Sequence, residues 1–436
     1  MPDAQAHAAA VPCFSHDRVP QQTNILGVGG WVPRQREHPY RMDTKFWHEL
    51  GLNAIRDNPN HPHAYGRCDA LSNRTLYDWV PASCTLDALQ DADDTACGPQ
   101  LGRQVLFVGD STIAQLFLSF VLSIGGAFGR DSHNTGTIHS LTAAACGGQV
   151  RLSFERADAL LWDGVVRTAN GASAHAFTCA CLNGMMVHRA FIERARTADV
   201  VVLGVGQHYA ALVEDTALQH RHLTYSFFAR NLNRTLATLA AANPNASRVI
   251  VGASAPIPGC SIPGRFTAPA RAAAVLMHES DAVPSNRYAV SWGHNARLNT
   301  LAREVALEVG ASYIDLTTLS ASRADDALGR FSRATFEDCV HYCMPGVVDE
   351  FARLVQSALA ARTDGPPSRR DEWRSVIDNA TWLGMRGAGS HLETYLSRRR
   401  NHSSDELLRN AQWAKLFVGP MNESECDAMC QNGVKG

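Results

Sequence analysis

The stretch that decides the fold reads QVLFV at residues 104–108, GDS at 109–111 and TIAQLFL at 112–118. The first five residues are an apolar run of the length of a buried β-strand, and the last seven continue as an apolar helix. A strand followed by a tight turn and a helix is the opening of an α/β unit. The sequence therefore predicts that Ser111 lies at the carboxyl end of a parallel strand, where a helix begins.

Further apolar segments of strand length alternate with helical patterns downstream. The cleanest helix is expected over residues 294–309, where Leu298, Ala302 and Val305 belong to an apolar stripe that ends before Gly310. Strands that alternate with helices predict a mostly parallel sheet covered on both faces, which is a three-layer α/β/α domain. Strands are expected at 150–154, 199–203, 248–251 and 312–316, and further helices at 228–242 and from 347 to about 361.

The chain of 436 residues is too long for one compact core, and its composition divides it into three parts. Residues 1–100 are irregular, rich in Pro, His, Asn and Asp, and contain four cysteines. They are expected to form a cysteine-rich segment packed on the α/β domain. That domain is expected over residues 101–364 and ends at a Gly-Pro-Pro boundary. Residues 365–436 form a C-terminal extension in which we find no motif.

Composition and charge exclude some classes of function. Apolar residues make up 45% of the chain and charged residues 19%, and the net charge is −2. These values are ordinary for a globular protein and give no reason to expect a nucleic-acid partner. The arginines at 398–400 are better explained as a solvated helix end than as a basic patch. No run of roughly 18 apolar residues predicts a transmembrane helix, and we expect a monomer.

Cysteines and glycosylation sequons favour the secretory pathway. The twelve cysteines include no CxxC pair, so they fit a disulfide framework better than a zinc ribbon or a redox motif. The N-terminal residues lack the basic flank and long apolar run of a signal peptide. Either a removed signal or a membrane anchor precedes this sequence, which is what we expect, or the prediction of the secretory pathway is wrong. Six N-x-S/T sequons point to the same compartment: Asn73, Asn233, Asn245, Asn379, Asn401 and Asn422.

Ser111 is the first candidate for a catalytic residue. Ligands of open α/β sheets bind at the carboxyl ends of the strands, and a serine at a strand-to-helix turn is exposed there. Its own backbone N–H would point towards an oxyanion formed on the acylated side chain. Taken alone, the GDS tripeptide is better explained as an ordinary helix start. The assignment therefore depends on a second motif.

The second motif is DCVHYCMPG at residues 338–346. Asp338 stands three residues before His341, and a loop can turn both side chains towards one point. The carboxylate can then hold the imidazole Nδ1–H and leave Nε2 as a general base towards a serine. One alternative is a disulfide-rich turn with an incidental histidine. Another is a zinc site of Cys339, His341 and Cys343, although this spacing is unusual for zinc. We expect no bound metal.

The two motifs together resemble those of a known family. FVGDS and, far downstream, DCVHYCMPG resemble the GDS and DxxH motifs of the PC-esterase branch of the SGNH hydrolases. That branch includes the plant trichome-birefringence-like polysaccharide O-acetyltransferases. The resemblance extends over most of residues 30–362 and is also carried by Gly30-Trp31-Val32-Pro33, Trp79-Val80-Pro81 with Cys84, Tyr313-Ile314-Asp315-Leu316, Arg323 and Asp325.

The resemblance implies an SGNH-hydrolase-like fold and an O-acetyltransferase that passes an acetyl group through an acyl-serine to a glycan hydroxyl. Ser111 would be the nucleophile, His341 the base and Asp338 its orienting acid. No bound cofactor is implied, and the acetyl donor, of which acetyl-CoA is one candidate, would be a co-substrate. The acceptor would be a glycan or polysaccharide. The Golgi lumen is the expected compartment, with secretion as the alternative.

Disulfide bonds near the second motif are implied as well. The resemblance implies a bond from Cys339 to an upstream cysteine, for which Cys260 is the best candidate. Cys343 would then be bonded into the N-terminal segment. Such bonds would fix the loop that carries the histidine, and a catalytic triad needs this kind of preorganisation.

One segment departs from the family. Residues 204–209 read GVGQHY, where SGNH enzymes have G-x-N-D and the plant branch has N-T-G-H-W-W. The asparagine that can supply an oxyanion donor is therefore missing. Its substitutes are the backbone N–H groups of Gly206 and Gln207 or the Gln207 side chain. A plain glycine-rich turn explains the segment equally well.

Further oxyanion or substrate-binding candidates are His208, beside this segment, and Asp110, beside the serine. The position of a second oxyanion glycine stays open between the pairs Gly125-Gly126 and Gly147-Gly148.

Two other functions compete with acetyl transfer. An esterase that removes acyl groups would use the same triad, because only the acceptor differs. A non-catalytic glycan-binding relative would keep the fold alone. The intact Ser, Asp and His argue against this last reading, whereas the missing asparagine argues for it. A polymeric acceptor would require an open groove at the site, and a small ester would fit a closed pocket.

Overall fold

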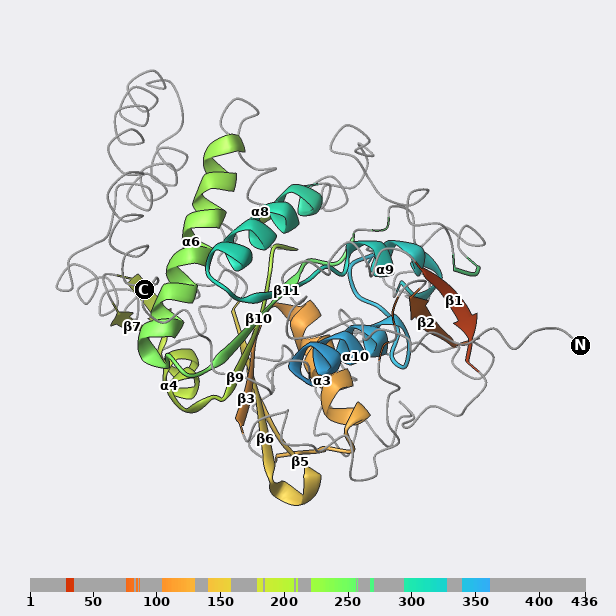
Figure 1. Ribbon diagram of the computed structural model, residues 1–436, viewed down its shortest axis with the longest axis horizontal. Helices are drawn as coiled ribbons and strands as arrows, with labels where there is room; N and C mark the ends of the chain where they lie inside the picture. The colour runs from red at the N-terminus through yellow and green to blue at the C-terminus, as the bar shows by residue number, and fades with distance from the viewer. Residues whose placement is uncertain are drawn as a thin grey trace, which may run out of the picture.

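The computed structural model of the protein describes residues 29–34, 76–81, 84, 86, 104–129, 140–157, 179–182, 185–207, 209–210, 221–255, 257, 267–269, 294–327 and 339–360. Within these residues a central sheet carries helices on both of its faces (Figure 1). The C-terminal extension predicted over residues 365–436 lies outside the described part of the chain.

The central sheet has seven strands in the order β11-β10-β9-β3-β6-β5-β4. The first five in this order pair in parallel, and β5 and β4 add an antiparallel edge beside β6. Their bounds are β3 Gln104–Gly109, β4 Ala127–Phe128, β5 Ser140–Ala145, β6 Val150–Arg156, β9 Val200–Val205, β10 Ser247–Gly252 and β11 Ser312–Ile314.

Helices cover both faces of this sheet because its strands are apolar on both sides. On β3, Val105 and Phe107 pack with α3 (Ser111–Ser123) and α10 (Val347–Ala360). The alternate residues Leu106 and Val108 pack with α4 (Arg189–Thr197), α6 (Arg221–Ala242) and α8 (Asn295–Glu308). Because side chains alternate between the two faces of a strand, the residues of β3 belong to two separate hydrophobic cores, one on each side of the sheet. Figure 1 shows α3 and α10 side by side on one face.

The predicted three-layer α/β/α architecture with a mostly parallel sheet is therefore confirmed. The helix expected from residue 228 starts earlier, at Arg221. The antiparallel edge was not predicted: β5 reads SLTAAA and contains few strand-forming residues, so its pairing with β6 decides its conformation. Smaller elements complete the described chain: β7 Cys179–Leu182, β8 Met185–His188, α9 Thr317–Ser322, and the 3₁₀ helices η4 Cys146–Gly148 and η7 Ala324–Asp326.

A separate two-stranded ribbon is formed by β1 (Gly29–Pro33) and β2 (Tyr77–Pro81). Trp31 and Trp79 face each other across it with their rings edge to face, 5.1 Å apart. The indole N–H of Trp31 donates to the Ser322 hydroxyl at 2.8 Å, and Arg353 Nη1 donates to the Trp79 carbonyl at 3.5 Å. The ribbon thus contacts the end of α9 and α10. The predicted domain boundaries at residues 100 and 364 stay predictions.

Glu350 of α10 is a buried carboxylate at this contact. Its side chain is paired with Arg353 at 2.9 Å and with Arg34, which follows β1, at 3.4 Å. Arg34 in turn bonds Asp78 of β2 through its Nε, at 2.6 Å. Burial raises the pKa of Glu350 to about 6, although the two arginines act in the opposite direction.

This pKa predicts that the protein loses stability as the pH rises. A group whose folded pKa lies above its unfolded value binds protons more tightly when folded, so its contribution is complete below pH 4.5 and is lost as the pH passes about 6. The free energy of unfolding should fall by about 2 kcal/mol on this account. Urea unfolding of Glu350→Gln should lack this decline, whereas the exposed-site control Glu304→Gln should keep it. Equal pH dependence in all three proteins would contradict the assignment.

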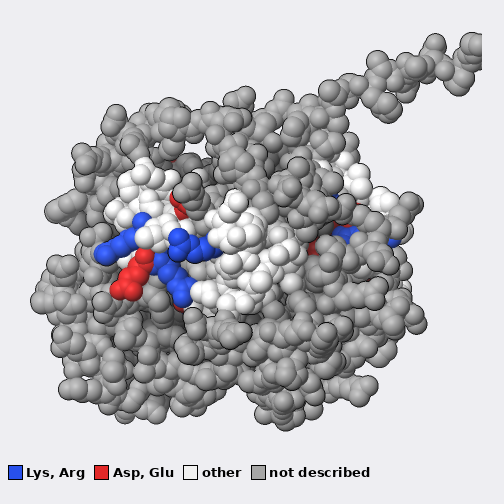
Figure 2. Space-filling view, turned by 90° about the horizontal axis from the view of Figure 1, so that it is seen from below, with Lys and Arg blue, Asp and Glu red and all other residues white. Residues whose placement is uncertain are grey.

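Charged side chains of both signs are visible on one face of the described part. Figure 2 shows one face of the molecule, on which basic and acidic side chains of described residues lie next to one another rather than in a patch of one sign. Among the described helices, none is long and apolar enough to span a membrane.

Candidate active site

Ser111 is the first residue of α3 and stands just beyond the carboxyl end of β3. Asp110 caps this helix: its carboxylate accepts hydrogen bonds from the backbone N–H of Thr112 at 2.9 Å and from the Thr112 hydroxyl at 2.6 Å. An acidic N-cap is favoured because the first N–H groups of a helix lack partners. Asp110 is therefore bonded within its own turn, and a contact between its side chain and substrate stays a prediction.

Two glycines let the first turn of α3 approach the sheet. A Cβ on Gly204 of β9 would overlap the side chain of Ile113, and one on Gly109 would lie 2.6 Å from Ile113 Cγ1. Any larger residue at these positions would push the helix outward. The sequence GDSTI, which joins β3 to α3, and the glycine on β9 thus place Ser111 directly at the strand ends.

His341 lies 230 residues further along the chain, and its Nε2 is 2.8 Å from Ser111 Oγ. At this distance the imidazole can take the serine proton when Nε2 is the unprotonated nitrogen. Both side chains are half-buried, so the pair is sheltered but reachable. The structure therefore brings together the serine and the histidine that the two motifs predict.

Asp338, the third predicted member of the triad, lies outside the described residues. The same holds for His208 and Cys260. The orienting role of Asp338, the substrate contact of His208 and the bond of Cys260 to Cys339 stay predictions.

The loop that carries His341 is fixed on one side by Asp326 of η7. The Asp326 carbonyl accepts the Cys343 N–H at 2.8 Å, and its carboxylate accepts the Val347 N–H at 2.9 Å. Asp326 is fully buried, so water does not compete for these bonds. Tyr342 forms an antiparallel bridge with Ala327, the residue after Asp326.

Asp349 of α10 fixes the loop on the other side. Its carboxylate accepts the Gly346 N–H at 2.7 Å and the hydroxyl hydrogen of Ser119. Ser119 belongs to α3, the helix that begins with Ser111. The His341 loop is thus tied to η7, α10 and the helix of the nucleophile.

Arg323 forms an ion pair with Asp326 and is itself fully buried. Its guanidinium bonds Asp325 at 2.9 Å and Asp326 at 2.6 Å, and its Cζ lies over the rings of Trp31 and Tyr77, 4.9 Å from each centroid. Burial opposes the charge, but the two carboxylates outweigh it and raise the pKa of Arg323 above its ordinary value. We call these five residues the arginine clamp. It joins the N-terminal ribbon to the element that holds the His341 loop.

Cys339 and Cys343, which flank His341, are each disulfide-bonded and buried. Cys84 and Cys146 are disulfide-bonded as well. A sulfur in a disulfide is not a thiolate ligand, so the alternative of a zinc site at Cys339, His341 and Cys343 loses two of its ligands. In the described part of the chain, no group of three metal-binding side chains comes together.

Gln207 follows β9 at the carboxyl edge of the sheet, and its side chain is used inside the fold. Nε2 donates to the Ser254 hydroxyl at 2.9 Å and to the Ser254 carbonyl at 3.3 Å, and Oε1 accepts from Asn295 at 2.8 Å. The amide is therefore already bonded, which disfavours its use as an oxyanion donor. Of the substitutes predicted for the missing asparagine, the backbone N–H groups of Gly206 and Gln207 remain.

Neither glycine pair considered for a second oxyanion contact lies at the site. Gly125 and Gly126 follow the last turn of α3, about 20 Å from Ser111 along the helix. Gly147 and Gly148 precede β6, which runs parallel to β3, so they lie at the amino edge of the sheet. Both candidates are wrong because spacing in sequence does not show at which edge a glycine turn lies.

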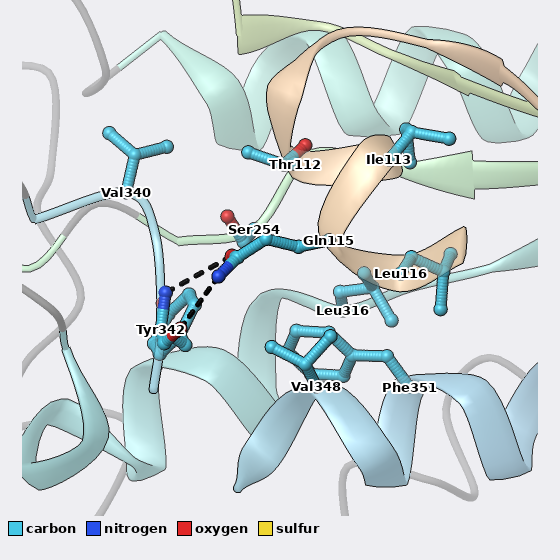
Figure 3. Close-up of a pocket in the computed structure, with 10 residues that line it drawn as sticks. All are labelled: Thr112, Ile113, Gln115, Leu116, Ser254, Leu316, Val340, Tyr342, Val348 and Phe351. Carbon is cyan, nitrogen blue, oxygen red and sulfur yellow. Dashed lines mark hydrogen bonds between the residues drawn. The ribbon is translucent and has the colours of Figure 1, made fainter. Parts of the chain in front are cut away.

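A small, mainly apolar cavity lies beside the first turns of α3, between that helix, α10 and the His341 loop (Figure 3). It has room for about one water molecule and is too small for an acyl group with its acceptor. The predicted open groove thus stays a prediction. The cavity is lined by Thr112, Ile113, Gln115, Leu116, Ser254, Leu316, Val340, Tyr342, Val348 and Phe351.

Sequence reasoning did not identify the residues that hold the His341 loop. Asp326 and Asp349 look like ordinary acidic residues in the sequence. Gln115 carries a weak signal, because it is a polar residue within the apolar helix TIAQLFL. A buried polar side chain in such a helix must find a partner elsewhere in the fold.

Comparison with known proteins gives one family match. Residues 278–358 match the PC-Esterase family, described as a GDSL/SGNH-like acyl-esterase family found in Pmr5 and Cas1p. The matched range contains Asp338 and His341 but not Ser111. No curated protein sequence matches the chain.

Three solved structures are distantly similar to the chain. A peptidoglycan O-acetylesterase has 11% identity and a TM-score of 0.34, with 67% of this chain and 95% of that chain covered. An extracellular lipase from Streptomyces rimosus has 13% identity and a TM-score of 0.30, with 59% and 100% covered. The periplasmic domain of a lipopolysaccharide acetyltransferase from Salmonella serovar Paratyphi A has 10% identity and a TM-score of 0.30, with 72% and 96% covered.

The sequence motifs, the central sheet and the family match all point to an SGNH-like fold. The three solved structures are too distant to say anything of substrate or reaction. The resemblance inferred from the GDS and DxxH motifs is confirmed by the family match, and residues 278–358 of this chain are similar to the PC-Esterase family of GDSL/SGNH-like acyl-esterases.

Proposed function

We propose that the protein is an O-acetyltransferase that acts on glycan hydroxyls through an acyl-serine, with Ser111 as nucleophile, His341 as base and Asp338 as its orienting acid. The observation that carries this proposal is the 2.8 Å contact between His341 Nε2 and Ser111 Oγ at the carboxyl edge of a parallel sheet. A serine and an imidazole in this geometry form the reactive part of an acyl-transfer triad.

In the first half-reaction, Ser111 Oγ attacks the carbonyl carbon of the acetyl donor while its proton passes to His341 Nε2. The carbonyl oxygen becomes an oxyanion. As the intermediate collapses, the bond from the carbonyl carbon to the leaving group breaks and the leaving group takes the proton from His341. The product is acetyl-Ser111.

In the second half-reaction, a glycan hydroxyl gives its proton to His341 Nε2 and attacks the acetyl carbon. The bond to Ser111 Oγ then breaks, and the serine recovers the proton from His341. The acetylated glycan leaves and the enzyme returns to its starting state. No bound cofactor is needed, and an acetyl donor such as acetyl-CoA would act as co-substrate.

Backbone N–H groups are the proposed oxyanion donors. The Ser111 N–H lies at the N-terminus of α3, where the helix dipole favours negative charge. The turn at Gly206 and Gln207 follows β9, the strand beside β3, so its N–H groups lie at the same edge of the sheet. Bonds from the Gln207 side chain to Ser254 and Asn295 hold that turn in place.

Hydrolysis is the second candidate function. The matched family is described as acyl-esterases, and the same acetyl-Ser111 could be attacked by water. The two functions share every residue named here and differ in the acceptor. A non-catalytic glycan-binding protein would need neither the Ser111–His341 contact nor a fixed loop.

The compartment proposed for this chemistry is the Golgi lumen, with secretion as the alternative. The four disulfide-bonded cysteines of the described chain and the sequons support an oxidising compartment. We propose a monomer that binds a glycan or polysaccharide and has no nucleic-acid partner.

The proposal is tested by supplying donor and acceptor separately. The purified chain is incubated with p-nitrophenyl acetate, with and without a panel of non-acetylated oligosaccharides, and products are followed by mass spectrometry. Acetyl transfer predicts that sugars gain an acetyl group faster than acetate appears in solution. Release of acetate alone would favour the esterase, and no turnover of p-nitrophenyl acetate with or without the oligosaccharides would favour the binding protein.

A further inference from the structure

Gln115 lies one helical turn beyond Ser111 and is almost fully buried, with 1% of its surface exposed. Residues four apart on a helix share one face, so Gln115 and Ser111 point towards the same side of α3. Its neighbours on the helix are apolar, among them Leu116 and Phe117. The amide is thus a buried polar group on the inner side of the nucleophile helix.

The amide of Gln115 is bonded on both sides to one residue of the His341 loop. Its Nε2 donates to the Tyr342 carbonyl at 2.7 Å, and its Oε1 accepts the Tyr342 N–H at 3.2 Å (Figure 3). A side-chain amide that pairs with both backbone groups of one residue acts as a neighbouring strand would. Tyr342 directly follows His341, so this pairing restrains the backbone beside the imidazole.

We propose that Gln115 is a positioning residue that sets the distance between His341 Nε2 and Ser111 Oγ. The inference rests on the proposed acyl-serine function. Ser111 and Gln115 belong to one rigid helix and are separated by a single turn. Because Gln115 is fixed relative to Ser111, its bonds to Tyr342 also fix the His341 loop relative to the nucleophile.

The other contacts to the loop described above do not involve the first turn of α3. Asp326 holds the loop to η7, and the Tyr342 hydroxyl donates to the Ala255 carbonyl at 3.1 Å. Ser119 links α3 to the loop through Asp349, but it does so at Gly346, five residues beyond His341. Of these contacts, the one from Gln115 lies nearest in sequence to both reacting side chains, four residues from Ser111 and one residue from His341.

An apolar side chain at this position would leave the N–H and the carbonyl of Tyr342 buried without these partners, and the loop would shift to satisfy them. A displacement of about 1 Å in a reacting group can lower a rate by roughly 100-fold. The disulfide-bonded Cys339 and Cys343 would still hold the loop near its place. We therefore expect slower chemistry in a folded protein.

The test uses a fluorophosphonate, because its reaction needs no knowledge of donor or acceptor. Ser111 Oγ attacks phosphorus, its proton passes to His341 Nε2, and fluoride leaves as the P–F bond breaks. Labelling of the full chain is followed over time at several probe concentrations, which separates the maximal rate from the probe's half-saturating concentration. The melting temperature is measured on the same samples.

Gln115→Met should lower the maximal labelling rate about 10- to 100-fold and leave the half-saturating concentration within about 2-fold. The matched control is Gln356→Met. Gln356 lies on α10 and donates to the Ser123 hydroxyl at the far end of α3, at 2.7 Å, so it joins the same two helices away from the site. This control should label at the wild-type rate.

Gln115→Glu adds a readout that a purely structural role would not move. When protonated, the introduced carboxyl can donate to the Tyr342 carbonyl and accept its N–H, as the amide does. When ionised, it cannot donate. The labelling rate relative to wild type should therefore rise as the pH falls, and this measurement does not depend on whether Gln115→Met folds well.

Four outcomes decide the matter. Slow labelling of Gln115→Met with an unchanged half-saturating concentration, and recovery of Gln115→Glu at low pH, would support the inference. Wild-type labelling of Gln115→Met, or an equal loss in Gln356→Met, would overturn it while the proposed function stands. Failure of the wild-type protein to label at Ser111 would overturn the proposed function and this inference with it.

Discussion

Ser111→Ala is expected to lose at least about 10³-fold in turnover of an acetyl ester, because the variant lacks the hydroxyl that forms the acyl intermediate. His341 Nε2 stands 2.8 Å from Ser111 Oγ, and it would have no proton to take in the variant. Release of p-nitrophenol measures the turnover. Peptide mapping after fluorophosphonate treatment should find the modification on Ser111 of the wild-type protein and on no other serine.

The control for this prediction lies on the same helix. Ser123 ends α3, and its hydroxyl donates to the Phe120 carbonyl, away from the site. Ser123→Ala should therefore keep the wild-type turnover. His341→Ala should lose about as much as Ser111→Ala, and the double variant should lose little more, because the two side chains act as one unit. Undiminished turnover in Ser111→Ala would end the acyl-serine proposal.

Arg323→Met is expected to lower the free energy of unfolding by about 3–5 kcal/mol. The substitution leaves the buried carboxylates of Asp325 and Asp326 without their cation, and an unpaired buried charge is strongly destabilising. Arg323→Lys should rescue little, because an ammonium cannot bond both carboxylates and also stack on the rings of Trp31 and Tyr77. Denaturant unfolding followed by tryptophan fluorescence measures the change.

Arg151 provides the comparison for Arg323. It lies exposed on β6, and Arg151→Met should change the free energy of unfolding by no more than about 0.5 kcal/mol. If Arg323→Met changed the free energy of unfolding as little as this control, the arginine clamp would not stabilise the fold. Because Asp326 holds the His341 loop, turnover by Arg323→Met should also fall at temperatures where the protein is still folded.

The main strands were predictable because each is a short apolar run followed by a turn or a helix. QVLFV became β3, and the run from residue 248 became β10. The antiparallel strands β4 and β5 were not predictable by this reasoning. β4 contains two residues, and β5 is rich in alanine, so both depend on pairing with a neighbour rather than on their own pattern.

The site was predictable as far as the motifs reached. Ser111 and His341 lie in the GDS and DxxH motifs, and this pair of motifs predicts that the two side chains are in contact. The contact between Gln115 and Tyr342 joins residues 227 positions apart, and no local pattern encodes such a contact. The glycine pairs show the same limit, because a sequence does not reveal which edge of a sheet a turn faces.

The arginine clamp joins residues near the start of the sequence to residues almost 300 positions later, and this separation has a consequence for biosynthesis. Trp31 bonds Ser322, 291 positions away, and Arg323 needs both Trp31 and Tyr77. At roughly 5–20 residues per second, tens of seconds of translation separate the first of these partners from the last. During that time the aromatic faces of the ribbon stay uncovered. The nascent chain is thus expected to need chaperones that shield aromatic segments, and it cannot assemble its histidine loop before residues 339–347 have been synthesised.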